Sequence, residues 1–524
     1  MAGKNILLIE PGYKNKYPPL GLMKIAQYHG PHGKRDNVKF IKGEDKSVLD
    51  KVWDRIYVTT LFSFEWKKTA ETIEFAIEAS HNQLNKIFVG GIAASLMPEA
   101  FLAESHWRGI RFIKGLLKDP PAVSLQLDRF SEELYSDDLG GTPIEDHIPD
   151  YDILKQIDYQ YPVYDAYFGY ASRGCVRKCS FCGVPKLEGE QRDIESIAGF
   201  VEGIEKLYGP KKDLILMDNN VVASARFKEI IAQIRDLGFT KGAKLKRGRI
   251  PVGRRVDFNQ GVDARILCKD PMYLRELSSI CIKPLRIAFD HIGVRKPYET
   301  AIRYSADVGL RDLSNYMLYN FKDTPADLYQ RMRLNIDLNE SLNISIFSFP
   351  MRYQPVTYKD RSHVGDHWKR YYLRSMQVIL QATHGIVSGA PKYFKRAFGD
   401  NEQEFEALLL RPHHFIFNRV WYDELDGRAE FDEYLAEMRT LSDSEKEELV
   451  ATLSMNDRGE YASAKKSLSS AKLRSIMNYY LPISRFEELR IWKKQKVRLK
   501  ARATEQVNVP DDERVEDAGL EIAA

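Results

Sequence analysis

Three cysteines fall within eight consecutive positions of this sequence, and no other residues in it point as clearly to chemistry. Cys175, Cys179 and Cys182 have the spacing C-x3-C-x2-C, and Phe181 directly precedes the third cysteine. Thiolates are the usual protein ligands of iron–sulfur clusters. Three thiolates on one short loop can hold three irons of a [4Fe–4S] cube and leave the fourth iron open to a small molecule. Ferredoxin-type electron carriers normally use four ligands, so the spacing favours chemistry at the metal.

Two other interpretations of this cluster are weaker. A structural zinc site needs a fourth ligand and commonly shows two C-x2-C pairs, whereas this sequence has one cluster with different spacing and no nearby histidine. Cysteine is often buried as a small hydrophobic residue, but Arg177, Lys178 and Ser180 make this loop too polar for a core. The remaining two cysteines, Cys268 and Cys281, are expected to be buried structural thiols.

The elements that must position the cysteines form a repeated pattern. Six strand-like runs alternate with stretches that can form helices, and the cysteine loop directly follows the first run. The last four runs start about 30 residues apart, the size of one βα unit. Six parallel βα units predict a partial or closed barrel, with its active site at the C-terminal ends of the strands. The six runs are residues 167–172, 213–218, 256–258, 285–290, 315–321 and 344–350, and candidate helices between them are 224–237, 297–308 and 325–337.

The N-terminal region shows a second alternation of strands and helices. Four short apolar runs alternate with helical spacing, which predicts a parallel, doubly wound, Rossmann-like α/β sheet. The strand-like runs are residues 5–10, 38–41, 55–60 and 87–89, with helices expected at 20–28 and 67–78. From about residue 358 helical periodicity dominates, as at 367–382, 402–410, 442–453 and 485–502.

These patterns predict a Rossmann-like domain, a partial (β/α)6 barrel and a helical C-terminal domain. The expected boundaries are 1–119 for the first domain, 120–165 for a linker, 166–357 for the barrel, 358–507 for the helical domain and 508–524 for an acidic, disordered tail. The chain has 524 residues, of which 44% are hydrophobic and 29% charged. This composition excludes a mainly disordered chain and a collagen-like fibre.

The same composition gives expectations about partners and location. No apolar run approaches the ~20 residues of a transmembrane helix, so no membrane partner is expected. The first residues lack a signal-peptide core. Five cysteines with one tight group do not match a secreted disulfide framework, and a reducing, cytoplasmic setting is expected. The net charge of +4 is too small to indicate nucleic acid by itself.

The cysteine loop and its position after the first barrel strand resemble the radical S-adenosylmethionine (radical SAM) superfamily. The resemblance implies a [4Fe–4S] cluster whose open iron binds SAM through its amino and carboxylate groups. Reductive cleavage of SAM would then give a 5′-deoxyadenosyl radical that abstracts hydrogen from a substrate. It also implies an external one-electron donor such as flavodoxin or ferredoxin.

The first 110 residues resemble the cobalamin-binding-type Rossmann domain that precedes many radical SAM barrels. The resemblance rests on residues 18–22 (PPLGL) and on Val89-Gly90-Gly91, followed by Pro98-Glu99. The motif Asp-x-His-x-x-Gly is missing, because residues 42–47 contain no histidine. Cobalamin binding and a degenerate domain that covers the barrel or holds substrate both remain open. If cobalamin binds, methyl transfer becomes the leading reaction.

Polar residues at the ends of the second and third barrel strands are candidate cofactor ligands. The superfamily commonly contacts the amino group of SAM at the end of the second strand through a Gly-Gly-Glu-like motif. Asp218 and Asn219 stand there in this sequence. In the third unit Gln260, Asp263 and Arg265 are placed to face the cavity, and Arg265 suits a carboxylate.

Residues after the fourth and sixth strands complete the candidate site. Asp290 could bond ribose hydroxyls, and His291 could carry a proton near neutral pH. Arg352 and Tyr353 follow the sixth strand, where they could close the site and Tyr353 could relay hydrogen. For all the strand-end residues, the alternative is a polar side chain that caps a strand or helix.

Basic segments give a weaker signal for RNA. Residues 241–255 hold seven basic residues and no acid, and residues 367–372 mix basic with aromatic side chains. That mixture fits single-stranded nucleic acid, although a solvated loop and a surface helix explain the same residues.

Two function classes follow. The first is a radical SAM enzyme with an unidentified substrate, which includes cobalamin-dependent methylation and RNA modification. A methylthiotransferase fits less well, because its second cluster needs three more cysteines in the N-terminal domain. The other class is a nonenzymatic iron–sulfur protein with a sensing or nucleic-acid-binding role.

Overall fold

The computed structural model describes residues 3–117, 143–194, 196–456 and 461–507. The chain divides into two compact units. The first comprises residues up to 323 together with 330–363 and 388–390, and the second comprises 324–329, 364–387 and the chain from 391 on. The predicted acidic tail, and residues 120–142 of the predicted linker, lie outside the described residues. Among the described helices, none has both the length and the apolar character required to cross a membrane.

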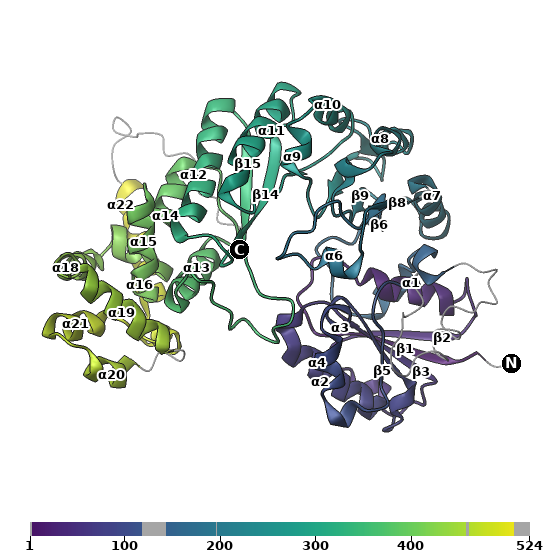
Figure 1. Cartoon of the computed structure of the whole chain (residues 1–524), viewed down its shortest axis with the longest axis horizontal. Helices are drawn as coiled ribbons and strands as arrows, with labels where there is room; N and C mark the ends of the chain where they lie inside the picture. The colour runs from purple at the N-terminus through teal and green to yellow at the C-terminus, as the bar shows by residue number, and fades with distance from the viewer. Residues whose placement is uncertain (1–2, 118–142, 195, 457–460, 508–524) are drawn as a thin grey trace. The chain divides into compact units, whose positions relative to one another are not determined.

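The first unit begins with a five-stranded parallel sheet in the order β2-β1-β3-β4-β5. Helices α1 (Leu20–His29) and α2 (Trp66–Ala79) lie on opposite sides of it (Figure 1). Right-handed crossovers require this, because β1 leads outward to β2 and β3 leads outward to β4 in the other direction. The predicted doubly wound, Rossmann-like sheet is confirmed. Its strands are Asn5–Glu10, Asn37–Lys42, Arg55–Thr60, Ile87–Gly91 and Arg111–Phe112.

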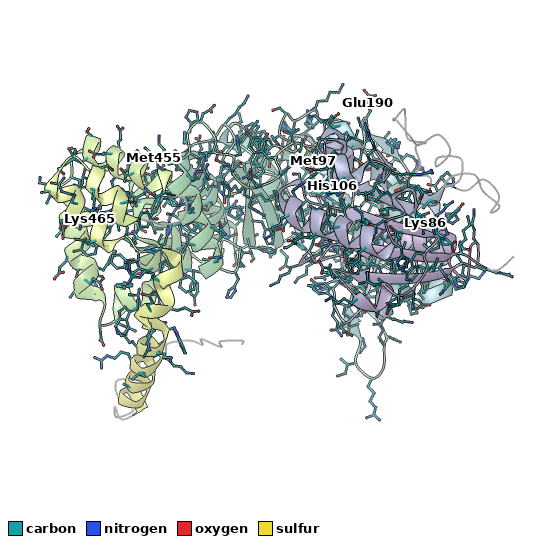
Figure 2. All side chains as sticks on the ribbon, turned by 90° about the horizontal axis from the view of Figure 1, so that it is seen from below. Lys86, Met97, His106, Glu190, Met455 and Lys465 are labelled. Atoms are coloured by element: carbon teal, nitrogen blue, oxygen red, sulfur yellow. The ribbon has the colours of Figure 1, made fainter. Side chains whose placement is uncertain are left out.

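Both faces of this sheet are buried, and one of them packs with α2 in a hydrophobic core. Leu7, Ile9 and Val58 are buried with Ile73 of α2 and with Met97, which Figure 2 labels. The short helices α3 (Ile92–Leu96) and α4 (Pro98–Leu102) follow β4 directly. The sequence did not predict β5, because two residues are too few to form a recognisable hydrophobic run.

Two further parallel sheets contain all six strands predicted for the second series. One has the order β12-β9-β6 and the other β13-β14-β15. Isolated parallel bridges, Val256–Ile282 and Val262–Ile287, join the two sheets. The strands are β6 Ala166–Gly169, β9 Asp213–Leu216, β12 Val256–Phe258, β13 Leu285–Arg286, β14 Asp312–Tyr319 and β15 Ser345–Arg352. The intervening helices are α7 Ile197–Tyr208, α8 Phe227–Asp236, α9 Ala264–Leu267, α10 Met272–Ser278, α11 Arg295–Asp307 and α12 Pro325–Leu342.

Strand β13 is shorter than the predicted run 285–290, although the chain beyond it still pairs. The amides of Ile287 and Phe289 donate to carbonyls of β14 at 2.9 and 3.1 Å. The fully buried Arg331 of α12 then donates to the carbonyls of Phe289, Asp290 and Leu318. This guanidinium fixes the backbone that carries Asp290.

The second unit is helical over its described residues. Its helices include α13 Arg370–Ala382, α14 Pro391–Phe398, α15 Glu402–Leu410, α16 His413–Phe417, α17 Arg419–Glu424, α18 Arg428–Arg439, α19 Asp443–Met455, α20 Tyr461–Ala464, α21 Ala471–Ile476 and α22 Ile491–Val507. Trp368, Tyr371 and Tyr372 are buried in its core. They are therefore unable to stack on bases. The aromatic residues at 367–372, which together with the basic ones suggested RNA binding, do not support it.

Candidate active site

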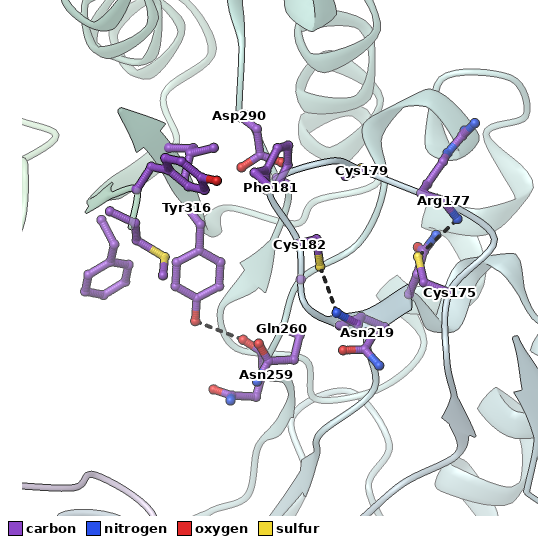
Figure 3. Close-up of a pocket in the computed structure, with 18 of the residues that line it drawn as sticks. Cys175, Arg177, Cys179, Phe181, Cys182, Asn219, Asn259, Gln260, Asp290 and Tyr316 are labelled. Carbon is purple, nitrogen blue, oxygen red and sulfur yellow. Dashed lines mark hydrogen bonds between the residues drawn. The ribbon is translucent and has the colours of Figure 1, made fainter. Parts of the chain in front are cut away.

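One cavity of about 690 Å³ lies within the first unit. Strand ends of the five-stranded N-terminal sheet and of the two three-stranded sheets meet there. Its volume falls inside the roughly 300–1,000 Å³ of small-molecule and cofactor sites. Cys175, Cys179 and Cys182 all line it (Figure 3). The cavity thus brings the three predicted ligands together at the carboxyl ends of the strands.

A short antiparallel ribbon closes the base of the cysteine loop. It pairs β7 (Ser172–Arg173) with β8 (Arg192–Asp193). Gly174 lies between this ribbon and Cys175 with φ +75°, and a Cβ there would lie 2.1 Å from the Glu190 carbonyl oxygen. Only glycine fits both constraints. The ribbon and this turn direct the loop from β6 into the cavity.

Backbone and side-chain donors already surround the sulfur atoms. The amide of Arg177 donates to Cys175 Sγ, and that of Val184 donates to Cys182 Sγ, each at 3.4 Å. The Arg265 guanidinium charge lies close enough to Cys179 to lower the pKa of its thiol. Burial raises the pKa of the Cys179 and Cys182 thiols, and these donors partly oppose the rise. Such bonds stabilise thiolates and tune iron–sulfur clusters.

The donor set suits a cluster better than a single ion. All five cysteines are free thiols. Among the described residues, no three His, Cys, Asp or Glu side chains are arranged to hold one metal ion. Zinc needs its ligands around one point, whereas a cube binds each thiolate at a different iron. Three soft donors on one cavity wall, two of which accept N–H···S bonds, fit a [4Fe–4S] cube.

Asp263 ties the cysteine loop to the third strand unit. Its carboxylate accepts from Arg177 Nε at 2.6 Å and from Arg265 Nε and Nη2 at 2.8 and 3.1 Å. It also accepts from the Arg265 amide at 2.9 Å. These bonds outweigh burial and lower the pKa of Asp263. Asp263 and Arg265 therefore lie where the sequence predicted, but they bind each other and Arg177.

At the end of β9, Asp218 and Asn219 have different surroundings. Asp218 is fully buried and accepts from the amides of Ala171 and Ser172 at 2.9 and 2.5 Å, and from Ser172 Oγ at 2.8 Å. Burial raises its pKa to about 6. Asn219 lines the cavity and donates to Glu188 Oε2 at 2.9 Å. Asn219 thus lines the cavity, while the Asp218 carboxylate holds the backbone before the cysteine loop.

Asp290 and His291 face the cavity after β13 (Figure 3 labels Asp290). Burial raises the pKa of Asp290 to about 6, although Arg331 and Arg265 oppose the rise. Burial, Arg265 and Arg331 lower the pKa of His291. Near neutral pH, the first group is close to its titration point and the second is an uncharged imidazole. Both side chains therefore have shifted pKa values beside the cavity.

A tyrosine from the N-terminal sheet reaches into the same cavity. Tyr17, which follows β1, donates its hydroxyl to Asn259 Oδ1 at 2.6 Å and packs edge-on against Phe168 of β6. Tyr316 of β14 donates to the Asn259 carbonyl oxygen at 2.9 Å (Figure 3). Gln260 is exposed beside them in the lining. Asn259 therefore connects the N-terminal sheet with strands of both other sheets.

Arg352, the last residue of β15, and Tyr353 after it border the cavity with Phe181. Tyr353 packs edge-on against Phe321 at 4.7 Å between ring centroids, and Phe181 packs edge-on against the same ring at 5.7 Å. Arg352 donates Nη2 to the carbonyls of Arg361 and His363 at 2.8 and 3.0 Å. Burial raises the pKa of Tyr353. All three predicted residues line the cavity.

The wall that the N-terminal sheet contributes is mostly apolar. It consists of residues that directly follow β3 and β4, namely Leu61, Phe62, Ser63, Phe64, Ile92, Ala93 and Leu96. The rings of Phe62 and Phe64 stack at 5.2 Å. The sequence analysis missed these residues, along with Lys16, Tyr17 and Glu188. Their position after parallel strands was the available signal, because ligands of open α/β sheets bind at carboxyl ends.

The sequence matches no protein-family model and no curated protein. Among solved structures, it is similar to the radical S-adenosylmethionine methyltransferase TsrM from Kitasatospora setae with cobalamin and a [4Fe–4S] cluster bound. The identity is 15% over 68% of this chain and 77% of that chain, with a TM-score of 0.46. It is also similar to OxsB, a cobalamin-dependent S-adenosylmethionine radical enzyme, at 13% identity over 97% and 82% of the chains with a TM-score of 0.46.

A third similarity is to SuiB from Streptococcus suis, solved bound to its precursor peptide SuiA. The identity is 14% over 42% of this chain and 46% of that chain, with a TM-score of 0.27.

Proposed function

We propose that this chain is a radical SAM enzyme. The observation that carries the proposal is the common cavity. Three cysteines spaced C-x3-C-x2-C, on the loop after β6, face a 690 Å³ space at the ends of β12, β13 and β15. The two three-stranded sheets would together make the partial (β/α)6 barrel. A nonenzymatic cluster would not need so large a ligand space beside its open iron.

The residues of the chain would share the work as follows. Cys175, Cys179 and Cys182 would hold the [4Fe–4S] cluster, which when bound supplies the electron that cleaves SAM to a 5′-deoxyadenosyl radical. Asn219 would accept a hydrogen bond from the amino group of SAM with its amide oxygen, because its amide nitrogen already donates to Glu188. Arg265 would place a positive charge beside the sulfurs while remaining bound to Asp263.

The rest of the lining would orient the ligands and exclude water. Phe181 and Tyr353 would cover one side of the cavity through their packing on Phe321. Asp290 would hold or release a proton near the substrate or accept a ribose hydroxyl. An external one-electron donor, such as flavodoxin or ferredoxin, is required by this chemistry.

Cobalamin-dependent methyl transfer is the finer proposal. It is favoured because the carboxyl edge of the N-terminal sheet opens onto the same cavity as the cysteines. The apolar wall of the N-terminal sheet fits a large, mostly apolar ring. Within the described lining no histidine comes from that domain, so a bound cobalamin would have no lower histidine ligand from it. Cobalamin, when bound, would supply the transferable methyl group. Equilibrium dialysis with hydroxocobalamin tests this branch, and the absence of bound cobalamin would exclude it without affecting SAM cleavage.

RNA as a substrate gains little support from the basic segment 241–255. It forms a hairpin of β10 (Lys244–Leu245) and β11 (Val252–Gly253). Arg247 binds Asp165 at 2.6 Å and Arg255 binds Asp213 at 2.7 Å, so part of its charge stabilises the unit itself. RNA modification remains a prediction.

Electron paramagnetic resonance on the anaerobically reconstituted, reduced chain tests the main proposal. A [4Fe–4S]+ signal is expected, and SAM should change it because SAM would ligate the open iron. A signal indifferent to SAM would support the nonenzymatic alternative. Bound zinc without a cluster would contradict the proposal.

A further inference from the structure

Lys16 differs from three arginines of the cavity, each of which is paired with a carboxylate. Arg177 and Arg265 share Asp263, and Arg286 binds Asp257 through Nε and Nη2 at 2.8 Å each. Among the described residues, no carboxylate forms an ion pair or hydrogen bond with the Lys16 ammonium, although the side chain lines the cavity. The charge therefore remains available to a ligand.

The surroundings of Lys16 strengthen its demand for an anion. Lys16 is an exposed residue, but partial desolvation of its ammonium, followed by the nearby charges of Arg286 and Arg255, lowers its pKa, and Asp257 opposes this shift. The Arg286 charge is already compensated by Asp257, so the local excess is one positive charge. An anion at this position would pair with the ammonium and offset its repulsion from the two arginines.

Aromatic rings lie beside this charge. The Lys16 ammonium lies 5.1 Å from the centroid of the Tyr17 ring. Arg286 lies 5.8 and 5.9 Å from the rings of Tyr316 and Phe349, which are paired residues on β14 and β15. The hydroxyls of Tyr17 and Tyr316 both donate to Asn259, so their ring positions are fixed. A flat apolar group can rest on these rings while its charged end reaches Lys16.

We propose that Lys16, Tyr17, Tyr316 and Phe349 form a substrate subsite for an aromatic or similarly apolar molecule with one anionic group, a carboxylate or a phosphate. The inference rests on the proposed function, because it assigns this ligand to the substrate and leaves SAM at the cysteines. It defines the substrate class by chemistry: an apolar body held by ring contacts, and one anionic group held by an ammonium.

Equilibrium dialysis of the reconstituted full chain tests the subsite with three probes. They are 2-naphthoate, its neutral analogue 2-naphthamide, and 2-naphthyl phosphate. The wild type should bind the anions more tightly than the amide. Tighter binding of the phosphate would identify a phosphate subsite, and tighter binding of the naphthoate a carboxylate subsite. Equal affinity for naphthoate, its amide and the phosphate would overturn the proposal.

Substitutions separate the charge from the apolar contacts. Lys16→Met should weaken binding of the preferred anion about tenfold, the value of roughly one charge-assisted hydrogen bond, and leave 2-naphthamide unchanged. Lys16→Arg should restore most of the anion affinity. Lys14→Met is the matched control, because Lys14 is an exposed lysine on the same loop outside the lining. Equal losses for the anion and the amide would contradict the assignment.

One further measurement distinguishes this proposal from the proposed function. The SAM-induced change in the cluster signal should be the same in Lys16→Met and wild type. If the variant alone loses its response to SAM, Lys16 holds SAM and the subsite assignment is wrong. If the cluster signal of the wild type does not respond to SAM, the radical SAM proposal fails. The comparison of 2-naphthoate with 2-naphthamide needs neither cluster nor SAM, so it tests the anion subsite separately.

Discussion

The two walls of the cavity differ in chemistry although both are built from the ends of parallel strands. The wall from β6, β9, β12 and β13 contains the three cysteines and a network of hydrogen-bonded charges centred on Asp263. The wall from β3 and β4 consists mainly of Leu61, Phe62 and Phe64, followed by α3. Ends of parallel strands thus carry thiols and charged side chains on one wall and apolar side chains, which define the form of the cavity, on the other. Changes on the polar wall should affect SAM cleavage, and changes on the apolar wall should affect packing.

The largest expected effect is at the cysteines. Cys179→Ala should abolish cluster binding and SAM cleavage, because two remaining thiolates cannot retain the cube. Cys268→Ala is the matched control, since its thiol donates to the Arg265 carbonyl at 3.6 Å and does not line the cavity. Iron content and 5′-deoxyadenosine formation measure both variants. Full iron content in Cys179→Ala would contradict the proposal that the cysteines of the polar wall hold the cluster.

The next effect is at Asp263. Asp263→Asn removes the negative charge and at least part of the bonding to Arg177 and Arg265, which support the cysteine loop. Loss of such supporting residues typically costs about 10–100-fold in metal affinity or activity. We expect the rate of 5′-deoxyadenosine formation to fall in that range and iron to be lost faster to a chelator. Asp270→Asn, at an exposed carboxylate that caps the Met272 amide, should leave both unchanged.

A third prediction concerns the pH dependence of the polar wall. Burial raises the pKa of Asp290 to about 6, whereas an unfolded Asp titrates near 3.9. The folded chain therefore binds this proton more readily, and stability is lost as pH rises from about 4 through 6. Two pKa units correspond to roughly 3 kcal/mol. Asp290→Asn should remove that part of the slope when unfolding of the cluster-free chain is measured between pH 4 and 8. An unchanged slope would mean that Asp290 is solvated.

The smallest effect is expected where the two walls touch. Gly183, next to Cys182, has φ −77°, and an added Cβ would lie 2.9 Å from Leu96 Cδ1 on the apolar wall. Gly183→Ala should destabilise the chain by about 1 kcal/mol through overpacking. The double variant Gly183→Ala with Leu96→Ala should recover part of this loss in a double-mutant cycle of unfolding free energies. Strictly additive losses would show that the two walls do not press on each other.

Prediction from sequence worked where the signal was local. The runs at 5–10 and 55–60 became β1 and β3 unchanged, and all six later strands are present. Asp218 shows the opposite case. Its position after β9 indicated a ligand contact, yet its carboxylate binds the backbone of Ala171 and Ser172, which are more than 40 residues away in sequence. A polar residue at a strand end has the same sequence signature whether it faces the ligand or the backbone.

The sequence by itself determined the three-cysteine loop, the alternation of strands and helices, and the placement of candidate residues at strand ends, because each depends on neighbours in the chain. Only the tertiary structure decided that Tyr17 reaches Asn259, 242 positions away, and that Asp263 binds Arg177 across 86. It also left Lys16 without a carboxylate partner in the described lining. Such contacts depend on how separate sheets pack together, and no local sequence pattern encodes contacts between residues so far apart in the chain.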